Sequence, residues 1–268
     1  MGFLGVIGNI SRDQISYPDG RTYELLGGAA LHVARAAGEA GLRAAPISII
    51  GDDLTWIIDD NRLSVVDFGS VRVSTGRSCA FILRYDEDDN LRSVQCYYGV
   101  STSLTAHALG VVARYDRYHI CCRRPLDVPS VLDRLAGTTF SLDFYVPSAA
   151  SLLVDATPFL STAACIFTNA AEFELLRDLI DPTRLARVIV SDGPNPVRLL
   201  QAGKIVAQIS PQTAGRVEVT GAGDVLAGAF LGFQAAGLPD AAALRHAVER
   251  AATAVQDPGI PLPAAEDT

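Results

Sequence analysis

Apolar runs with strand-like spacing alternate with helix-like patterns along most of this chain, and the alternation limits the folds available to it. Short apolar runs predict buried strands, and apolar residues three or four apart predict one face of a helix. Such a succession predicts a mostly parallel sheet with helices on both faces. The expected elements lie at residues 3–7, 29–40, 45–50, 117–121, 128–135, 139–143, 164–168, 170–179 and 188–191, followed by a hairpin at 197–209 and alanine-rich helices at 223–236 and 241–255.

Two segments interrupt this alternation and predict a small second β-layer. Residues 14–26 contain the turn sequence Tyr17-Pro18-Asp19-Gly20 between short strand-like pieces. Residues 76–99 hold two strand-like pieces on either side of an acidic turn, which is expected to be solvated. We therefore expect a single α/β domain over residues 1–268, with a small β lid contributed by about 14–26 and 76–99.

The charge and hydropathy of the chain exclude several classes of protein. Its formal net charge of −8 argues against a general nucleic-acid binder, which needs a basic face to neutralise phosphates. The sequence has no apolar run of the roughly 18 residues that cross a bilayer, and its start lacks the features of a signal peptide. We therefore expect neither a nucleic-acid partner nor a membrane partner.

The cysteines are odd in number and lack the spacing of a zinc site. Most lie among apolar or strand-like residues, where a free thiol behaves as a small hydrophobic side chain. Free thiols favour a reducing compartment, and we expect the protein to be cytoplasmic. The five are Cys79, Cys96, Cys121, Cys122 and Cys165.

The segment Glu218-Val219-Thr220-Gly221-Ala222-Gly223-Asp224 runs directly into the helical pattern VLAGAFLGF. Small residues at a helix start allow a ligand to approach the backbone closely, and the first N–H groups with the helix dipole favour an anion there. A carboxylate in this first turn can accept the proton of a hydroxyl that attacks phosphorus. The alternative is an acid that only stabilises the helix N-terminus.

The same segment resembles the C-terminal signature of the ribokinase-like (PfkB) family of sugar and nucleoside kinases. Further matches follow the family's order along the chain, and together they cover about residues 6–260. The resemblance implies a ribokinase-like three-layer α/β/α sandwich with a mostly parallel central sheet and a small β lid. The other matches are Gly27–Ala34, the Gly-Gly pair that opens a helix; Ile50–Asp53, a strand end with G-x-D; Phe167–Glu172, the N-x-x-E motif; and Val188–Gly193, a strand followed by glycine.

The resemblance implies an ATP-dependent kinase that phosphorylates a hydroxyl of a small sugar, sugar derivative or nucleoside. Asp224 resembles the catalytic base, and the backbone of Gly221, Ala222 and Gly223 resembles the anion hole. Asp13, Gly27, Gly28 and His32 fall at the family's substrate-binding positions.

The resemblance also implies ATP and Mg²⁺ as cofactors, with a monovalent cation as a further possibility. Asn169 and Glu172 are expected to organise Mg²⁺ through water, because this ion keeps much of its hydration shell. The same pair would also serve as a helix cap with an acid three residues on. The residues expected at the nucleotide are Asn169, Ser191, Gly193, Thr220, Gly221 and Gly223.

The chain departs from the family pattern at four places. The region after Asp53 is short, and the longer helix of the family is compressed into residues 54–66. His32 replaces an asparagine of many sugar kinases, and a lone histidine on an apolar helix is also typical of a core residue. Glu218 and Val219 replace the usual Asp and Thr of the last motif. Gly193-Pro194-Asn195-Pro196 is stiffer than a glycine-rich loop, because proline fixes φ.

Two other classes of function are alternatives to the kinase. A sugar- or nucleoside-binding regulatory protein on the same fold would keep the binding residues without catalysis, and the intact Asp224 argues against it. A dinucleotide oxidoreductase would use Gly2, Gly5 and Gly8, but their spacing is not GxGxxG and no helix follows directly. The face of the lid sheet could also pair two copies as a homodimer.

Overall fold

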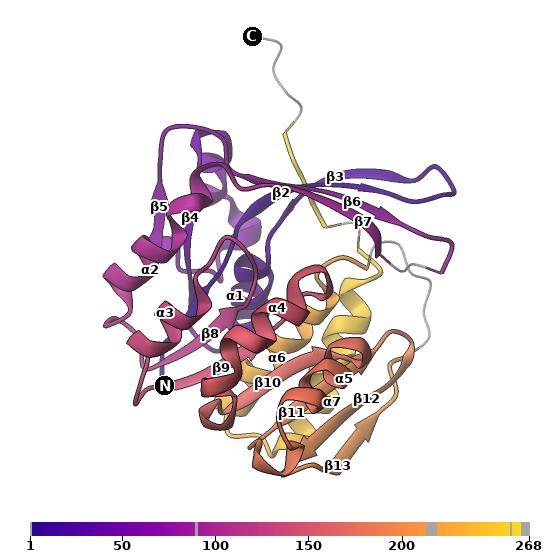
Figure 1. Ribbon diagram of the computed structural model, residues 1–268. Helices are drawn as coiled ribbons and strands as arrows, with labels where there is room; N and C mark the ends of the chain where they lie inside the picture. Colours follow the sequence, from indigo (N-terminus) through magenta and orange to yellow (C-terminus); the bar gives the residue numbers. More distant parts are fainter. Residues whose placement is uncertain (1, 89–90, 213–218, 258, 264–268) are drawn as a thin grey trace.

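The computed structural model describes residues 2–88, 91–212, 219–257 and 259–263. A nine-stranded sheet in the order β13-β12-β11-β10-β9-β8-β1-β4-β5 forms its centre (Figure 1). Its strands run parallel from β11 to β5, and β12 is antiparallel to both of its neighbours. The strands are β1 (Leu4–Ile7), β4 (Ala44–Ile50), β5 (Val71–Val73), β8 (Arg117–Cys121), β9 (Thr139–Asp143), β10 (Cys165–Asn169), β11 (Val188–Asp192), β12 (Asn195–Gln201) and β13 (Lys204–Ile209).

Helices cover both faces of this sheet and bury one apolar cluster on each (Figure 1). The inner strands such as β1 and β4 are buried throughout because both faces of the sheet are covered, as expected for a parallel sheet. One face carries α1 (Ala29–Glu39), α6 (Ala222–Ala235) and α7 (Asp240–Ala254); the other carries α2 (Leu104–Val111), α3 (Val128–Arg134), α4 (Val146–Ala156) and α5 (Ala170–Leu179).

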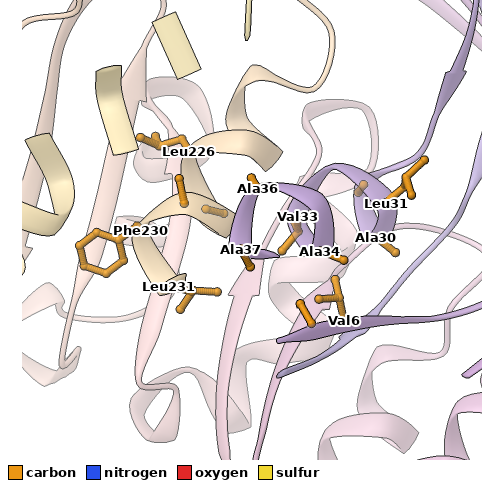
Figure 2. Packing of buried hydrophobic residues seen from close by; sticks show 14 of the residues in the cluster. Val6, Ala30, Leu31, Val33, Ala34, Ala36, Ala37, Leu226, Phe230 and Leu231 are labelled. Carbon is orange, nitrogen blue, oxygen red and sulfur yellow. The ribbon is translucent and has the colours of Figure 1, made fainter. Parts of the chain in front are cut away.

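Glycines bring α1 and α6 into close backbone contact. Figure 2 shows buried side chains of the two helices, among them Ala37 of α1 and Phe230 of α6. A Cβ added at Gly228 would lie 2.2 Å from the carbonyl oxygen of Val33, and one at Gly232 would lie 2.6 Å from Ala40 Cβ. Near its start, α6 meets His32 in the same way at Gly221. The contacts follow the same order along both helices, so their N-termini lie at the same end.

The second sheet is five-stranded, in the order β14-β3-β2-β6-β7, and projects from the main body (Figure 1). It has a small apolar cluster of its own, which includes Ile15, Leu25 and Leu83. The edge strand β14 comes from the C-terminal segment, where the sequence predicts no strand. The strands are β2 (Ser11–Ser16), β3 (Thr22–Gly27), β6 (Cys79–Tyr85), β7 (Leu91–Tyr97) and β14 (Ile260–Pro261).

Several expectations differ from the structure in detail. Helices α2 and α4 were not expected, and residues 52–63 form 3₁₀ turns. Part of the acidic turn at 86–90, Glu218 and the end of the tail lie outside the described residues.

All five cysteines are free thiols, and Cys96 alone among them is only half-buried. Within the described ranges, no helix is long and apolar enough to cross a membrane.

Candidate active site

A cavity of about 800 Å³ lies where the second sheet meets the carboxyl ends of the main strands. This is the edge at which open parallel sheets bind ligands. Of the site residues expected from the sequence, Gly27 does not line it. The structure brings the others together here: Asp13, Gly28, His32, Asn169, Glu172, Ser191, Gly193, Thr220, Gly221, Ala222, Gly223 and Asp224.

Asp224 reaches this cavity from the first turn of α6. The helix follows Gly221, whose φ of 80° is a left-handed conformation that favours glycine. A side chain is excluded there for a second reason, because an added Cβ would lie 2.9 Å from the His32 ring. The Ala222 N–H donates to the Val219 carbonyl at 3.3 Å, so that N–H is already engaged within the turn.

Arg123 joins Asp224 to a second buried carboxylate. Its Nη2 donates to Asp224 Oδ1 at 2.7 Å, and its Nη1 donates to the two carboxylate oxygens of Asp143 at 3.0 and 2.9 Å. Asp143 ends β9, and Arg123 follows β8 by two residues. Sequence reasoning missed both residues. Their places at the ends of adjacent parallel strands are the signal that could have found them.

The two carboxyl groups of this cluster have pKa values shifted in opposite directions. Burial and, to a smaller extent, the negative charge of Asp143 raise the pKa of Asp224 to about 7, against the lowering effect of Arg123. Burial also disfavours ionised Asp143, but the charge of Arg123, with a contribution from His119, holds its pKa below the ordinary range. Asp143 is therefore the permanent carboxylate of the pair, and Asp224 is the one that can change its protonation near neutral pH.

His32 lines the cavity and lies next to the Gly221 turn. It is half-buried, and its ring packs against Gly221. Burial lowers the pKa of His32 to about 4, with further lowering by the positive charges of Arg35 and Arg123. The imidazole is thus neutral at pH 7. The His32 ring lines the cavity and also packs within the fold, and its contact with a substrate stays a prediction.

Asp13 reaches the cavity from β2, on the side of the second sheet. It is buried, and its Oδ1 accepts a hydrogen bond of 2.6 Å from Ser11 Oγ. A Cβ at Gly27 would lie 2.0 Å from Asp13 Oδ2, so this glycine makes room for the carboxylate. At Gly28, with φ of 100°, a Cβ would meet the Asn9 carbonyl at 2.4 Å. The Gly-Gly pair therefore shapes the Asp13 side of the cavity.

Asn169 and Glu172 cap the start of α5 reciprocally. Asn169 Oδ1 accepts from the Glu172 N–H and Glu172 Oε2 accepts from the Asn169 N–H, each at 2.9 Å. Both side chains line the cavity, and their oxygen donors suit a hard cation such as Mg²⁺. Since each already has an oxygen bonded to backbone, contact with the ion through water fits them better than direct coordination. The cap is present, and it is compatible with the expected metal role.

The second sheet touches the turn before α6 through two tyrosines. Tyr85 OH lies 2.8 Å from Thr220 Oγ1, and the Val219 N–H donates to Tyr17 OH at 3.4 Å. The two rings stack with centroids 5.1 Å apart. Sequence reasoning gave neither tyrosine a role. The contacts make the turn that carries Asp224 part of the interface between the two sheets.

Within the part of the chain that the structure describes, the side chains of His119, Cys121 and Asp143 form a group that could hold a metal ion. Arg123 already donates to both Asp143 oxygens, and burial raises the pKa of the Cys121 thiol well above its ordinary value. A neutral thiol beside a guanidinium is a poor cation site, because metal ligation needs the thiolate. We assign no metal to this group.

Comparison with known proteins identifies the family. A family model described as pfkB family carbohydrate kinase matches residues 3–266. The chain belongs to this kinase family. It is 28% identical to the cytidine kinase of Thermococcus kodakarensis, over 92% of this chain and 94% of that protein. The phosphotransferase class expected from the motifs is therefore confirmed.

Solved structures support the fold. The nucleoside kinase of Burkholderia thailandensis, solved with inosine, matches with a TM-score of 0.82 and 21% identity, over 98% of this chain and 94% of that one. A structure from E. coli named as a ribokinase II, solved with ATP and Mg²⁺, matches with a TM-score of 0.79 and 18% identity, over 97% and 94%. The expected ribokinase-like sandwich with its β lid is confirmed, and the second sheet is called the lid below.

Proposed function

We propose that this chain transfers the γ-phosphate of ATP to a hydroxyl of a small sugar, sugar derivative or nucleoside. The observation that carries the proposal is the position of Asp224, a buried carboxylate in the first turn of α6 that lines the same cavity as Asp13. The turn at Gly221 sets the helix start beside that carboxylate, which favours an anionic oxygen there. An acceptor hydroxyl and a phosphoryl group would thus meet at one helix end.

In this reaction the acceptor oxygen forms a bond to the γ-phosphorus, and the bond from that phosphorus to the bridging oxygen breaks, releasing ADP. The hydroxyl proton passes to the Asp224 carboxylate. Its pKa of about 7 lies near the pH at which a general base is most effective. Backbone N–H groups at Gly221, Ala222 and Gly223 would stabilise the transferred oxygens. The Ala222 N–H would have to leave the Val219 carbonyl to take part.

The nucleotide would occupy the half of the cavity formed by β10, β11 and the α6 start. Ser191, Gly193 and Thr220 lie there, and Asn169 and Glu172 would hold hydrated Mg²⁺. When bound, Mg²⁺ would neutralise phosphate charge. The E. coli ribokinase II relative was solved with ATP and Mg²⁺, which supports this pair of cofactors.

The acceptor would occupy the half that the lid covers, beside Asp13 and His32. A carboxylate can accept hydrogen bonds from two adjacent hydroxyls of a ribose or another sugar. Phe81, Phe144 and Tyr145 also line the cavity, and aromatic rings of this kind can pack against a nucleobase. The cytidine kinase and the nucleoside kinase named above support a nucleoside as the acceptor to test first.

The test is ATP consumption by the purified protein with Mg²⁺ against nucleosides, sugars and sugar amines. We expect turnover with one class of acceptor, and a loss of about 10²–10⁴-fold in kcat for Asp224→Asn. Asp155→Asn removes an exposed helical carboxylate and serves as the matched control. If no compound is phosphorylated but one raises the melting temperature, the chain is a binding protein on a kinase fold, and the proposal is wrong.

A further inference from the structure

Arg123 is held between two buried carboxylates, and this arrangement is more specific than an ordinary ion pair. One nitrogen of the guanidinium contacts Asp224, and the other contacts both oxygens of Asp143. The side chains of Asp143, Asp224 and Arg123 are 7%, 11% and 16% exposed. Little water is present to screen their charges, so each group strongly affects its neighbours. The planar fork of arginine also fixes the orientation of whatever it binds.

The other groups that face this cluster come from several elements. His119 of β8 has Nε2 at 3.8 Å from Asp143 Oδ1, while its Nδ1 is 2.9 Å from Ser141 Oγ. Cys121 of the same strand has a pKa well above its usual value, so its thiol is neutral. His32 of α1 is neutral at pH 7, and Glu172 of α5 lines the same cavity. Asp224 is the only titratable side chain of α6 itself.

The charges of the cluster explain why Arg123 and Asp143 both affect the ionisation of Asp224. Asp224 and Asp143 together carry two negative charges when ionised, and Arg123 carries one positive charge. Arg123 is shared, because one of its nitrogens donates to both oxygens of Asp143 and the other donates to one oxygen of Asp224. Asp224 therefore receives only part of the stabilisation that a guanidinium can give.

We propose that Arg123 and Asp143 are positioning residues of the phosphoryl transfer: Arg123 orients the Asp224 carboxylate and favours its ionised form, and Asp143 holds Arg123 and limits that effect. This inference rests on the function proposed above. Neither residue exchanges a proton with the acceptor, because arginine stays charged and Asp143 stays ionised. Their effect is on how readily Asp224 accepts the hydroxyl proton.

The proposal predicts shifts of opposite sign in the two variants. Arg123→Met removes the positive charge that contacts Asp224, so the acid limb of the kcat/KM profile should move up by about one pH unit or more. Asp143→Asn removes the neighbouring negative charge, so the same limb should move to lower pH. Arg123→Lys keeps the charge without the planar fork, and should retain the midpoint better than Arg123→Met while lowering kcat. Arg124→Met removes an adjacent exposed charge and should leave the midpoint unchanged.

A second measurement does not depend on turnover. The carboxyl ¹³C signal of Asp224, assigned by its loss in Asp224→Asn, can be titrated in the wild type and in each variant. We expect the midpoint to rise in Arg123→Met and to fall in Asp143→Asn. A protein without kinase activity that still shows these shifts would contradict the proposed function but keep the charge coupling. Midpoints that stay equal, or that move in the same direction in both variants, would overturn the inference.

Discussion

The hydroxyl oxygens of Tyr85 and Thr220 lie 2.8 Å apart and join the lid to the turn from which α6 begins. The two residues are 135 positions apart in the sequence, and both line the same cavity. The lid therefore directly contacts the segment that carries Asp224. A closed lid also excludes water from the reacting groups, which strengthens every charge interaction inside.

Tyr85→Phe should weaken lid closure without unfolding the lid. A neutral hydrogen bond contributes about 0.5–1.5 kcal/mol, so the closed state should lose roughly twofold to tenfold in population. We expect KM for the acceptor to rise by a similar factor in steady-state assays. Tyr97→Phe is the matched control, because Tyr97 lies on the lid strand β7 with 58% of its surface exposed. An equal effect of both variants would show that the Tyr85 hydroxyl has no specific role.

Asp13→Asn should affect acceptor binding more than ATP binding. The substitution keeps the shape of the side chain but replaces a charged acceptor of hydroxyl hydrogen bonds, which are worth about 1.5–3 kcal/mol. KM for the acceptor should therefore rise about tenfold or more, with KM for ATP nearly unchanged. Asp19→Asn alters an exposed acid in the same hairpin and should change neither constant. A parallel rise in both constants after Asp13→Asn would contradict the assignment.

Gly228→Ala should destabilise the fold through the contact between α1 and α6. The new methyl group would lie 2.2 Å from the Val33 carbonyl, and forcing such a contact typically costs about 1–3 kcal/mol. Urea denaturation followed by circular dichroism measures the loss. Gly110→Ala in α2 meets no atom within 4 Å, and should stabilise by about 0.5–1 kcal/mol because alanine is the better helix former. Unchanged stability of Gly228→Ala would mean that the two helices can separate at little cost.

The raised pKa of Asp224 predicts how stability depends on pH. With a pKa of about 7 when folded and 3.8 as its ordinary value, this group binds more protons in the folded state between those limits. Its contribution to the free energy of unfolding therefore falls as pH rises through this window, and above pH 7 the ionised form is a net cost. Asp224→Asn should be more stable than the wild type at pH 8, by up to about 4 kcal/mol. The gain should shrink towards pH 5 in urea titrations, and a constant difference across the range would argue against the shift.

The sequence predicts the central strands closely because their signals are local. The bounds of β8 (Arg117–Cys121) and β9 (Thr139–Asp143) match the expected ones, since each is a short strand-like segment that contains apolar residues and is bounded by turn-forming sequence. Helices α2 and α4 were missed. Both are short and apolar over much of their surface, so helical periodicity does not distinguish them from buried strands.

The candidate site was predictable where its residues belong to a contiguous motif. Asp224 and the glycine turn lie in one segment, and so do Asn169 and Glu172 of the α5 cap. Arg123 and Asp143 lie in no motif, because their significance comes from partners that the fold supplies. Arg123 is 101 residues from Asp224, and such a pair is visible only once the strands are ordered in the sheet.

The glycine contacts between α1 and α6 hold the two helices at a short separation. Both helices begin at the cavity, one beside Asp13 and the other beside Asp224. Their separation is set by backbone atoms at Gly228 and Val33, and no side-chain rotamer can change it. The gap across which a hydroxyl must reach phosphorus is thus built into the scaffold. Adaptation to a larger acceptor would have to come from the lid, whose strands can change without altering that gap.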